Sequence, residues 1–430
     1  MQFQIPKGTF DILPYGADEP WQLSYLWRHV EETARRLCEE YGYLEIRTPI
    51  YEKTELFQRG VGEGTDIVTK EMYTFEDKGG RSITLRPEGT APAVRSFVEK
   101  RLANVGSVHK LFYIGPMFRH ERPQSGRYRQ FHQFGIEAIG ASLPEQDAEV
   151  IDLLYQFCAR LGLKNLKVHI NSVGDAPSRD AFRRALLEYL RPHLKELSEE
   201  SRERLEKNPL RILDSKDPKD QKIVLKAPSI LHYLTDEAKK NFQVLCQRLD
   251  MIHVPYEIDD KIVRGLDYYN HTVFEILTQD IGAQNALGGG GRYDGLIGQF
   301  DGPDLPGAGF ATGLERMIQT MLAQNVAPKE IRPPSIYFIP FNQDEAARAK
   351  CFSLATLCRH NHLPAQIELH AKKVPAAIQN ASRLGASYCA VLGSDELEKG
   401  ALQLKHLQTR EQREVSFDRL IATLKELFHA

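Results

Sequence analysis

The stretch KLFYIGPMFRHERPQSGRYRQFHQFGIE, residues 110–137, has two strand-like runs on either side of a polar segment at 120–128. Apolar and aromatic runs that flank a polar connection are typical of an antiparallel hairpin. We therefore expect an antiparallel hairpin with a long loop. Residues 119–129 contain four arginines against one glutamate. The planar guanidinium suits phosphate and carboxylate oxygens, so this segment favours anion binding over a merely solvated loop.

The second strand of this hairpin predicts an unusual polar face. Because side chains alternate along a strand, one face carries Arg129, Phe131, Gln133, Gly135 and Glu137. The apolar residues between them point the other way. This polar face fits the floor of a substrate site, with Phe131 able to stack on a planar ring.

Three further clusters carry residues suited to ligand binding. In the run LRPEGT, residues 85–90, the carboxylate of Glu88 lies beside Gly89 and Thr90 and could hold an ammonium group; a capped helix start is the alternative. The runs VRGLDYY at 263–269 and LGGGGRYDG at 287–295 form the second cluster. Four consecutive glycines let a backbone approach a ligand closely, although a hairpin turn would also explain them.

The third cluster, GAGFATGLER at 307–316, nearly matches a dinucleotide-binding fingerprint. Its third glycine is displaced and no ribose-binding carboxylate follows at the usual distance, so we reject that interpretation. The chain also has no GxxxxGK[ST] motif. Any phosphate binding must therefore rely on arginine.

Composition excludes several classes of protein. The chain has 430 residues, enough for about three domains, and 56 Lys and Arg against 58 Asp and Glu give a net charge of −2. Nucleic acid would therefore be bound through local patches. No run approaches the roughly 18 apolar residues of a membrane span, and the amino terminus does not resemble a signal peptide. Six cysteines without a CxxC pair indicate reduced thiols in a cytoplasmic protein. The nearest group of possible metal ligands is interpreted as a solvated helix end rather than a zinc site: Cys351, Cys358, His360 and His362.

The chain is expected to divide into two domains. Residues 23–41 have helical spacing, Gly42 is a natural helix stop, and a strand-like run from 44 ends at Pro49. This pair belongs to a first domain at 1–325, which contains a charged helical insertion at about 175–255. A proline-bearing linker, 326–334, leads to a domain at 335–430 in which strands alternate with helices. That alternation predicts an α/β domain with a largely parallel sheet.

These motifs together resemble those of the bacterial histidyl-tRNA synthetases, which are class II aminoacyl-tRNA synthetases. The helix and strand ending at Pro49 resemble motif 1, FRHE at 118–121 resembles motif 2, and 307–316 resembles motif 3. Those three indicate only the class. The runs RGLDYY at 264–269 and GGRYDG at 290–295 resemble the histidine-specific signatures, and a third signature lies within 62–73.

The resemblance implies an α+β fold, in which helices flank the antiparallel sheet of class II synthetases. A helical insertion and a C-terminal α/β anticodon-binding domain complete it. It implies a homodimer formed through motif 1. The implied reaction activates L-histidine with ATP to histidyl-adenylate and pyrophosphate, then transfers histidine to the 3′ end of tRNA(His). Mg²⁺ on the β- and γ-phosphates is expected, with no protein metal ligand assigned.

The resemblance also implies roles for individual residues. The expected histidine-binding residues are Glu88, Gly89, Thr90, Arg119, Gln133, Glu137, Arg264, Tyr268 and Tyr269. The expected ATP-binding residues are Arg119, Glu121, Arg127, Phe131 and Arg316. Arg264 and Arg119 are the expected catalytic residues. A carboxylate that attacks an α-phosphate brings two anions together, and a cation between them, Arg264, lowers the barrier.

Two other functions remain as alternatives. One is a catalytically silent paralogue that senses histidine as a regulatory subunit of ATP phosphoribosyltransferase. The other is a class II synthetase for proline, threonine or glycine. Intact histidine signatures and a long C-terminal domain disfavour both. That domain has 12 Lys and Arg against 10 Asp and Glu from residue 333 onward, so its charge is weak evidence for RNA binding, and the resemblance carries the anticodon role.

Overall fold

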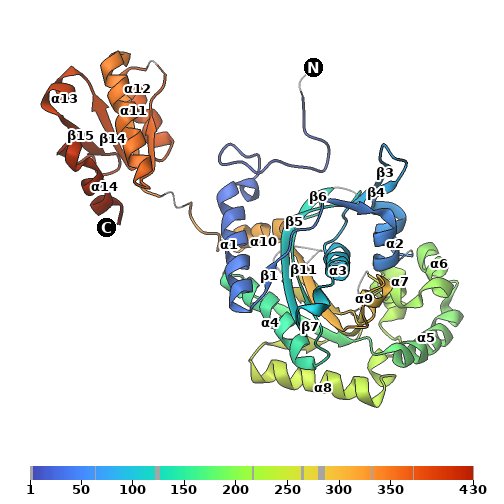
Figure 1. The fold of residues 1–430 in the computed structure, drawn as a ribbon. Coiled ribbons are helices and arrows are strands. Elements are labelled where there is room, and N and C mark those ends of the chain that lie inside the picture. The colour runs from blue at the N-terminus through green and yellow to red at the C-terminus, as the bar shows by residue number, and fades with distance from the viewer. Residues whose placement is uncertain are drawn as a thin grey trace. The chain divides into compact units, whose positions relative to one another are not determined.

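The computed structural model describes residues 3–62, 64–121, 126–215, 217–262, 266–278, 286–330, 333–370 and 372–429. The chain forms two compact units, Met1–Pro328 and Lys329–Ala430 (Figure 1). Within the described residues no helix is long and apolar enough to cross a membrane.

A large mixed sheet organises the first unit. Its strands run in the order β1 (Leu44–Glu45), β5 (His109–Phe118), β6 (Gln130–Ile139), β11 (Gly307–Gly313), β10 (Ala286–Arg292), β9 (Asn270–Leu277), β7 (Lys167–Ser172) and β8 (Tyr256–Ile258). The six central strands pair antiparallel, while β1 on β5 and β8 on β7 pair parallel at the two edges. The expected antiparallel class II sheet is therefore confirmed in its centre.

The predicted hairpin at 110–137 is confirmed. Strands β5 and β6 pair antiparallel over their whole length, from His109 opposite Ile139 to Phe118 opposite Gln130. The strand expected from residue 44 is shorter than predicted. It ends at Glu45, and further along the carbonyl of Thr48 accepts a 3.0 Å hydrogen bond from the guanidinium of Arg86 instead of a strand partner.

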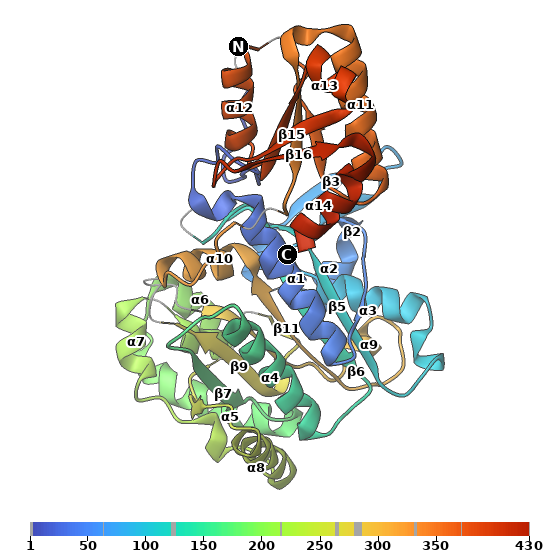
Figure 2. The same ribbon diagram turned by 90° about the vertical axis from the view of Figure 1, so that its left-hand side faces the viewer.

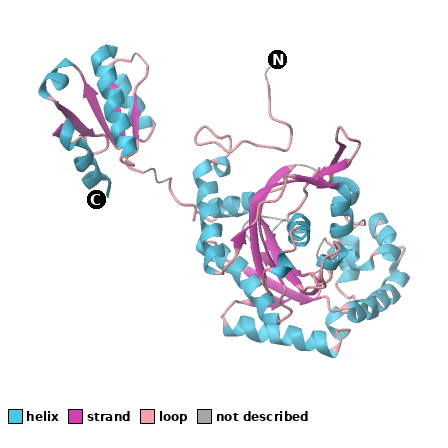
Figure 3. Cartoon of the chain, in the orientation of Figure 1, coloured by secondary structure: helices cyan, strands magenta, loops and turns pink. Residues whose placement is uncertain are grey.

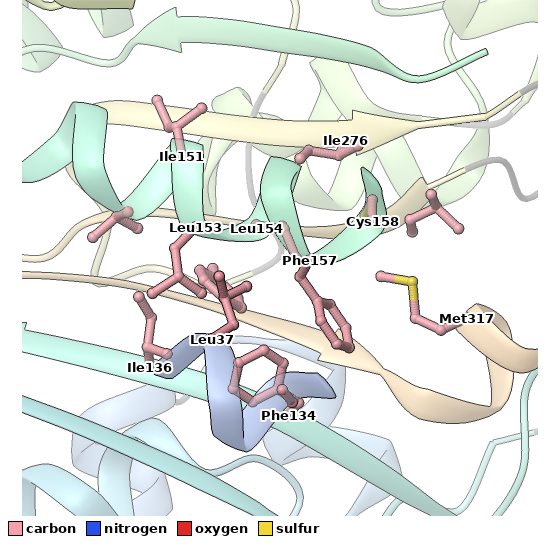
Figure 4. Close-up of a cluster of buried hydrophobic side chains, with 14 of the residues drawn as sticks. Leu37, Phe134, Ile136, Ile151, Leu153, Leu154, Phe157, Cys158, Ile276 and Met317 are labelled. Carbon is pink, nitrogen blue, oxygen red and sulfur yellow. The ribbon is translucent and has the colours of Figure 1, made fainter. Parts of the chain in front are cut away.

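One face of the sheet is covered by helices. Helices α1 (Ser24–Glu40), α4 (Pro144–Arg160) and α10 (Leu314–Ala323) lie on it (Figures 1 and 2). The hydrophobic core there is shown in Figure 4 and includes Leu37, Phe134, Ile136, Ile151, Phe157 and Met317. Helix α1 ends just before Gly42, whose φ of +76° is a conformation that glycine adopts without strain.

The opposite face is concave and holds the odd-numbered side chains of β6. The sheet curves around helix α3 (Thr90–Glu99), as the strand colouring of Figure 3 shows. Beside it lie α9 (Leu296–Gln299), α2 (Thr54–Val61), the π-turn η2 (Ile67–Glu71) and a small sheet in the order β2 (Tyr51–Lys53), β4 (Ser82–Leu85) and β3 (Tyr73–Glu76). Short 3₁₀ turns occur at η1 (Pro20–Gln22) and η3 (Leu102–Asn104).

A helical insertion connects β7 to β8. Its elements are α5 (Ala176–Leu190), η4 (Arg191–His193), α6 (Glu199–Lys207), η5 (Pro209–Asp214), α7 (Pro218–Val224), η6 (Ile230–His232) and α8 (Asp236–Met251). Phe182, Leu186 and Ile212 of the insertion belong to a hydrophobic cluster that also includes Val273 of β9, while Leu245 of α8 packs into the main core. The insertion is therefore a folded element attached to the sheet.

The second unit is a five-stranded sheet with helices. The strand order is β13 (Ala365–Ile367), β12 (Ile336–Pro340), β14 (Tyr388–Leu392), β15 (Ala401–His406) and β16 (Gln412–Ser416). Its helices are η7 (Phe341–Gln343), α11 (Glu345–His360), α12 (Val374–Arg383), α13 (Ser394–Lys399), η8 (Phe417–Arg419) and α14 (Leu420–His429). Only β13, β12 and β14 are parallel. The prediction of a largely parallel sheet missed the antiparallel hairpin β15–β16. In both strands buried residues lie between exposed polar ones, so only one face of the hairpin is buried.

Candidate active site

A cavity of about 340 Å³ opens on the concave face of the large sheet. It is lined by residues from five separate segments of the chain, 88–90, 119–133, 266–275, 286–289 and 311–316. Among them are these predicted site residues: Glu88, Thr90, Arg119, Glu121, Arg127, Phe131, Gln133, Tyr268, Tyr269 and Arg316. Because these residues come from β6, the start of α3, the loops at β5 and β9, and the start of α10, the fold rather than sequence proximity gathers them.

Two predicted residues that the structure describes, Gly89 and Glu137, do not line this cavity. Arg264 lies outside the described residues. Gly89 precedes α3, and a Cβ there would lie 2.1 Å from the ring of Tyr113, so only glycine fits. Glu137 is buried and is not among the lining residues.

Glu88 caps the start of α3 from within the cavity wall. Its two carboxylate oxygens accept hydrogen bonds from the backbone N–H groups of Thr90, at 2.7 Å, and Ala91, at 2.9 Å. Burial raises the pKa of Glu88, while these amides and the guanidinium of Arg119 oppose the rise. The capped helix start is therefore confirmed, and the same carboxylate also lines the cavity, where it could hold an ammonium group.

Arginines gather over the β6 side of the cavity. Arg119 donates a 2.8 Å hydrogen bond to the carbonyl of Pro87, and its guanidinium lies 5.3 Å from the ring centre of Phe131. Arg127 Nη1 lies 3.1 Å from Glu121 Oε2. Arg119, Arg127 and the ring of Phe131 therefore lie in one wall of the cavity, which Arg316 also lines.

Arg316 enters the cavity from the first turn of α10. Its guanidinium donates hydrogen bonds to the carbonyls of Ala286, at 2.5 Å, and Gly126, at 3.3 Å. Burial lowers the pKa of Arg316, and the neighbouring charge of Arg127 lowers it further. Because a guanidinium stays protonated in proteins, the side chain is a fixed positive charge in the wall.

The glycine-rich strand β10 serves the packing of the sheet as well as the cavity. Gly288 and Gly289 line the cavity. A Cβ at Gly290 would instead lie 1.9 Å from the carbonyl oxygen of Gly309 on β11. Some of the glycines are therefore required by close approach of neighbouring strands, a reason that the sequence alone did not separate from ligand binding.

Behind the cavity wall lies a buried polar layer centred on Glu137. The hydroxyl of Tyr293 donates a hydrogen bond to Glu137 Oε2 at 2.5 Å, and that of Tyr113 donates one to Oε1 at 3.3 Å. The Tyr268 ring meets the Tyr293 ring edge-on at 5.7 Å. Burial raises the pKa of Glu137 to about 8, although the Tyr293 hydroxyl lowers it. The carboxyl group therefore keeps its proton to a higher pH than an ordinary glutamate does.

Several other lining residues were not predicted as site residues, among them four with polar side chains: Tyr128, Glu275, Thr312 and Glu315. Glu315 is buried and accepts hydrogen bonds from the backbone N–H of His132, at 2.7 Å, and from its ring nitrogen Nδ1, at 3.0 Å. The sequence signal was present, because Glu315 directly precedes Arg316. Glu275 is a lone acid in an apolar strand, which gives no such signal.

The signature arginine Arg292 is placed away from the cavity. Its guanidinium is buried and pairs with Asp147 on α4, at 2.7 Å between Nη2 and Oδ1. It also donates to Asp294 and to the carbonyl of Ala141. This part of the GGRYDG run therefore anchors α4 to the sheet.

An antiparallel sheet with an arginine-walled cavity between the hairpin strand β6 and the strand–helix unit β11–α10 defines a class II aminoacyl-tRNA synthetase. A family model described as histidyl-tRNA synthetase matches residues 22–317, and a model described as anticodon binding domain matches residues 335–427. The chain belongs to the histidyl-tRNA synthetase family.

Similar proteins extend over the whole chain. The histidine–tRNA ligase of Protochlamydia amoebophila is 52% identical over 425 residues, which cover 99% of this chain and 100% of that protein. That of Bacillus licheniformis is 50% identical over 430 residues, covering 99% of each. The crystal structure of apo S. aureus histidyl-tRNA synthetase is 38% identical, with a TM-score of 0.82, and covers 99% of this chain and 100% of that one.

Proposed function

We propose that this chain is a histidine–tRNA ligase. It activates L-histidine with ATP to histidyl-adenylate and pyrophosphate, then transfers histidine to the 3′ end of tRNA(His). The observation that carries this proposal is the match to histidine–tRNA ligases over the full length, catalytic unit and anticodon-binding domain alike. The same match disfavours a histidine-sensing regulatory subunit and a synthetase for another amino acid.

The histidine α-amino group is assigned to the end of the cavity at Glu88 and Thr90, with Gln133. Two features support the assignment. Glu88 brings a carboxylate to the wall, and Gln133 Oε1 is a buried acceptor with no hydrogen-bond partner among the described residues. A buried acceptor without a hydrogen-bond partner destabilises the protein, and an ammonium group that donates to it removes that cost.

The imidazole is assigned to Tyr268 and Tyr269, with Glu137 behind them. A site whose buried polar groups must be paired by the substrate rejects analogues that lack those groups by about 10⁴-fold or more. Glu137 is the buried carboxyl group assigned to this recognition, and the hydroxyls of Tyr293 and Tyr113, which donate to its two oxygens, fix its orientation. No separate editing site is needed for this selection.

ATP is assigned to the arginine wall. Phe131 is placed to stack on adenine, Glu121 to meet the adenine edge, and Arg119 to bind the α-phosphate. Arg127 and Arg316 take the outer phosphates. Guanidinium groups replace the missing P-loop in this scheme, because each offers planar donors and a permanent charge to phosphate oxygens.

Mg²⁺ belongs with the nucleotide in this proposal. Mg²⁺ keeps several waters and binds through phosphates and one or two carboxylates. Within the part of the chain that the structure describes, no group of three or more His, Cys, Asp or Glu side chains could hold a metal ion. The cavity wall contains carboxylates, Glu275 and Glu121 among them, that would supply such a ligand. When bound, Mg²⁺ neutralises charge on the β- and γ-phosphates.

Arg264 is assigned the position between the histidine carboxylate and the α-phosphate. It lies outside the described residues, two positions before Leu266, which lines the cavity. The assignment rests on the RGLDYY run and on the need for a cation where two anions meet. Arg119 assists from the other side of the α-phosphate.

A homodimer and a cytoplasmic location complete the proposal. The edge strand β1 exposes Leu44, at 71%, and the adjoining segment exposes Ile50 and Tyr51. Exposed apolar side chains next to an unpaired strand edge are typical of a subunit interface. All six cysteines are free thiols, which fits the cytoplasm.

The test is ATP–pyrophosphate exchange with each of the twenty amino acids, followed by charging of tRNA(His). Exchange that depends on histidine alone, together with charging, supports a ligase. Histidine binding without exchange supports the silent regulatory subunit, and exchange with a different amino acid moves the chain to another synthetase.

A further inference from the structure

The helical insertion contacts the chain segment that carries the two tyrosines of the cavity. Arg211, in η5, donates from Nη2 to Asp267 Oδ1 at 2.9 Å and from Nη1 to the carbonyl of Gly64 at 2.7 Å. Asn208, beside it, donates to the same Asp267 oxygen at 3.2 Å. One turn of the insertion is therefore tied to two loops of the catalytic unit.

A second arginine of the insertion reaches the same segment two residues further on. Arg179, in α5, donates from Nη1 to the carbonyl of Tyr269 at 3.2 Å. Arg211, through the side chain of Asp267, and Arg179, through the carbonyl of Tyr269, thus contact the chain on both sides of Tyr268. Leu266, Tyr268 and Tyr269 all line the cavity.

The side chain of Asp267 is directed away from the cavity and into this contact. It is not among the lining residues, and its carboxylate also packs against Gly62, where a Cβ would lie 2.8 Å from Oδ2. The Asp267 backbone N–H points to the carbonyl of Val61 at 3.4 Å. The carboxylate therefore lies between the loop that follows α2 and the guanidinium of Arg211.

The contact with Arg211 has the properties of a specific interaction. The Arg211 side chain is only 13% exposed, and its charged guanidinium donates one hydrogen bond to a carboxylate and one to a backbone carbonyl. Charge-assisted bonds of this length are about twice as strong as neutral ones. By comparison, among the described residues Arg202 of the same insertion donates to the carbonyl of Leu197, within the insertion itself.

We propose that Arg211 is a positioning residue for the amino-acid pocket. By holding Asp267, and with Arg179 holding Tyr269, the insertion fixes the segment from which Leu266, Tyr268 and Tyr269 enter the cavity. The insertion is then part of the frame of the histidine site. This inference rests on the proposed function, because it assigns that segment to histidine.

The experiment compares Arg211→Ala with the unaltered chain in ATP–pyrophosphate exchange, measuring KM for histidine, KM for ATP and kcat. Loss of a hydrogen bond to a charged group corresponds to about a tenfold change, so KM for histidine rises about tenfold while KM for ATP stays within about twofold. Arg211→Lys keeps the charge and restores part of the loss. Arg202→Ala is the matched control and leaves all three constants unchanged.

A purely structural role gives a different result. Partial unfolding of Arg211→Ala lowers the active fraction and therefore kcat, but leaves KM unchanged. Asp267→Asn, which keeps the shape of the side chain, provides a second variant with Arg211 intact, and it raises KM for histidine selectively as well. Combining Arg211→Ala with Asp267→Asn adds little to either change, because both break one contact.

Two outcomes overturn the inference. If the unaltered chain exchanges with histidine and Arg211→Ala and Asp267→Asn leave KM for histidine unchanged, or raise both KM values equally, Arg211 does not position the pocket. If the unaltered chain shows no histidine-dependent exchange, the proposed function fails and this inference fails with it.

Discussion

Tyr293 holds Glu137 through a buried hydrogen bond of 2.5 Å between the phenol and Oε2. Neither residue lines the cavity, yet the pair lies directly behind Tyr268. A tyrosine of the GGRYDG run therefore fixes the orientation of the carboxyl group assigned to imidazole recognition. The tyrosine acts through the glutamate and has no contact with the space in which histidine is placed.

Removing that hydroxyl changes how histidine recognition depends on pH. A hydroxyl that donates to a carboxylate stabilises the charged form, and the Tyr293 hydroxyl lowers the pKa of Glu137. In Tyr293→Phe the pKa of Glu137 therefore moves above its value of about 8. We therefore measure kcat/KM for histidine between about pH 6 and 9.5. We expect the pH at which kcat/KM changes with the charge of Glu137 to be higher in Tyr293→Phe than in the unaltered chain. Tyr113→Phe is the control: its hydroxyl is 3.3 Å from the other oxygen, so its shift is smaller.

Glu137 also makes stability depend on pH. Burial raises its pKa from 4.5 to about 8, so the folded chain keeps a proton that the unfolded chain releases between these values. Its contribution to stability is complete below about pH 4.5 and is lost as the pH rises through about 8. Glu137→Gln has no such proton. We expect the Tm of Glu137→Gln to rise relative to the unaltered chain as the pH increases from about 5 to 8.5; a constant difference in Tm would contradict this account.

Glu137→Gln is also expected to affect the Michaelis constants of the two substrates differently. KM for histidine rises more than KM for ATP, because the arginine wall and Phe131 are untouched. Equal changes in both constants would remove Glu137 from the amino-acid pocket.

The buried pair of Asp147 and Arg292 predicts a large loss of stability when one partner is removed. Their side chains are 6% and 3% exposed, and Thr272 donates a further hydrogen bond to Asp147 at 2.7 Å. Removing one partner of a buried ion pair leaves an unpaired buried charge and costs about 3–5 kcal/mol. We therefore expect Asp147→Ala to lower the free energy of unfolding by that amount in urea titrations. Glu45→Ala, at a partly exposed contact with Arg35, serves as the control and costs under about 1 kcal/mol.

The hairpin at 110–137 could be predicted because its pattern repeats every two residues. That period puts Phe134 and Ile136 in the core and Phe131 and Gln133 on the cavity face, as the structure has them. The helix ending before Gly42 followed from helical spacing in the same way. Local periodicity was enough in both cases.

Contacts between distant segments could not be predicted in this way. Nothing in the residues near Asp267 indicates that its partner is Arg211, 56 positions earlier. The pairing of His132 with Glu315 spans 183 positions. Sequence patterns predicted which elements form, and the resemblance indicated which residues meet, but partners that serve only to position others carry no local signal.

Dimer formation is predicted to depend on the exposed edge at β1. Replacing Leu44, which is 71% exposed, by arginine puts a charge into the assigned interface without disturbing the core. We expect sedimentation to give a dimer for the unaltered chain and a monomer–dimer mixture for Leu44→Arg at the same concentration. Leu225→Arg, at an equally exposed leucine in the insertion, stays dimeric. A stable, active monomer of the unaltered chain would exclude the interface.

The rate of adenylate formation is predicted to depend most on Arg264. The histidine carboxylate and the α-phosphate repel each other as they approach, and a fixed cation between them stabilises the transition state more than the bound substrates. Loss of one preorganised donor of this kind lowers the rate by about 10²- to 10³-fold, so Arg264→Ala should reduce kcat for histidine-dependent pyrophosphate exchange by that factor. Arg264→Lys keeps the charge without the planar pair of donors and recovers part of the rate. If kcat for Arg264→Ala is close to that of the unaltered chain, the chemical step depends on the remaining arginines instead. Arg119 is the first of these, because its guanidinium already lies in the cavity wall beside the ring of Phe131.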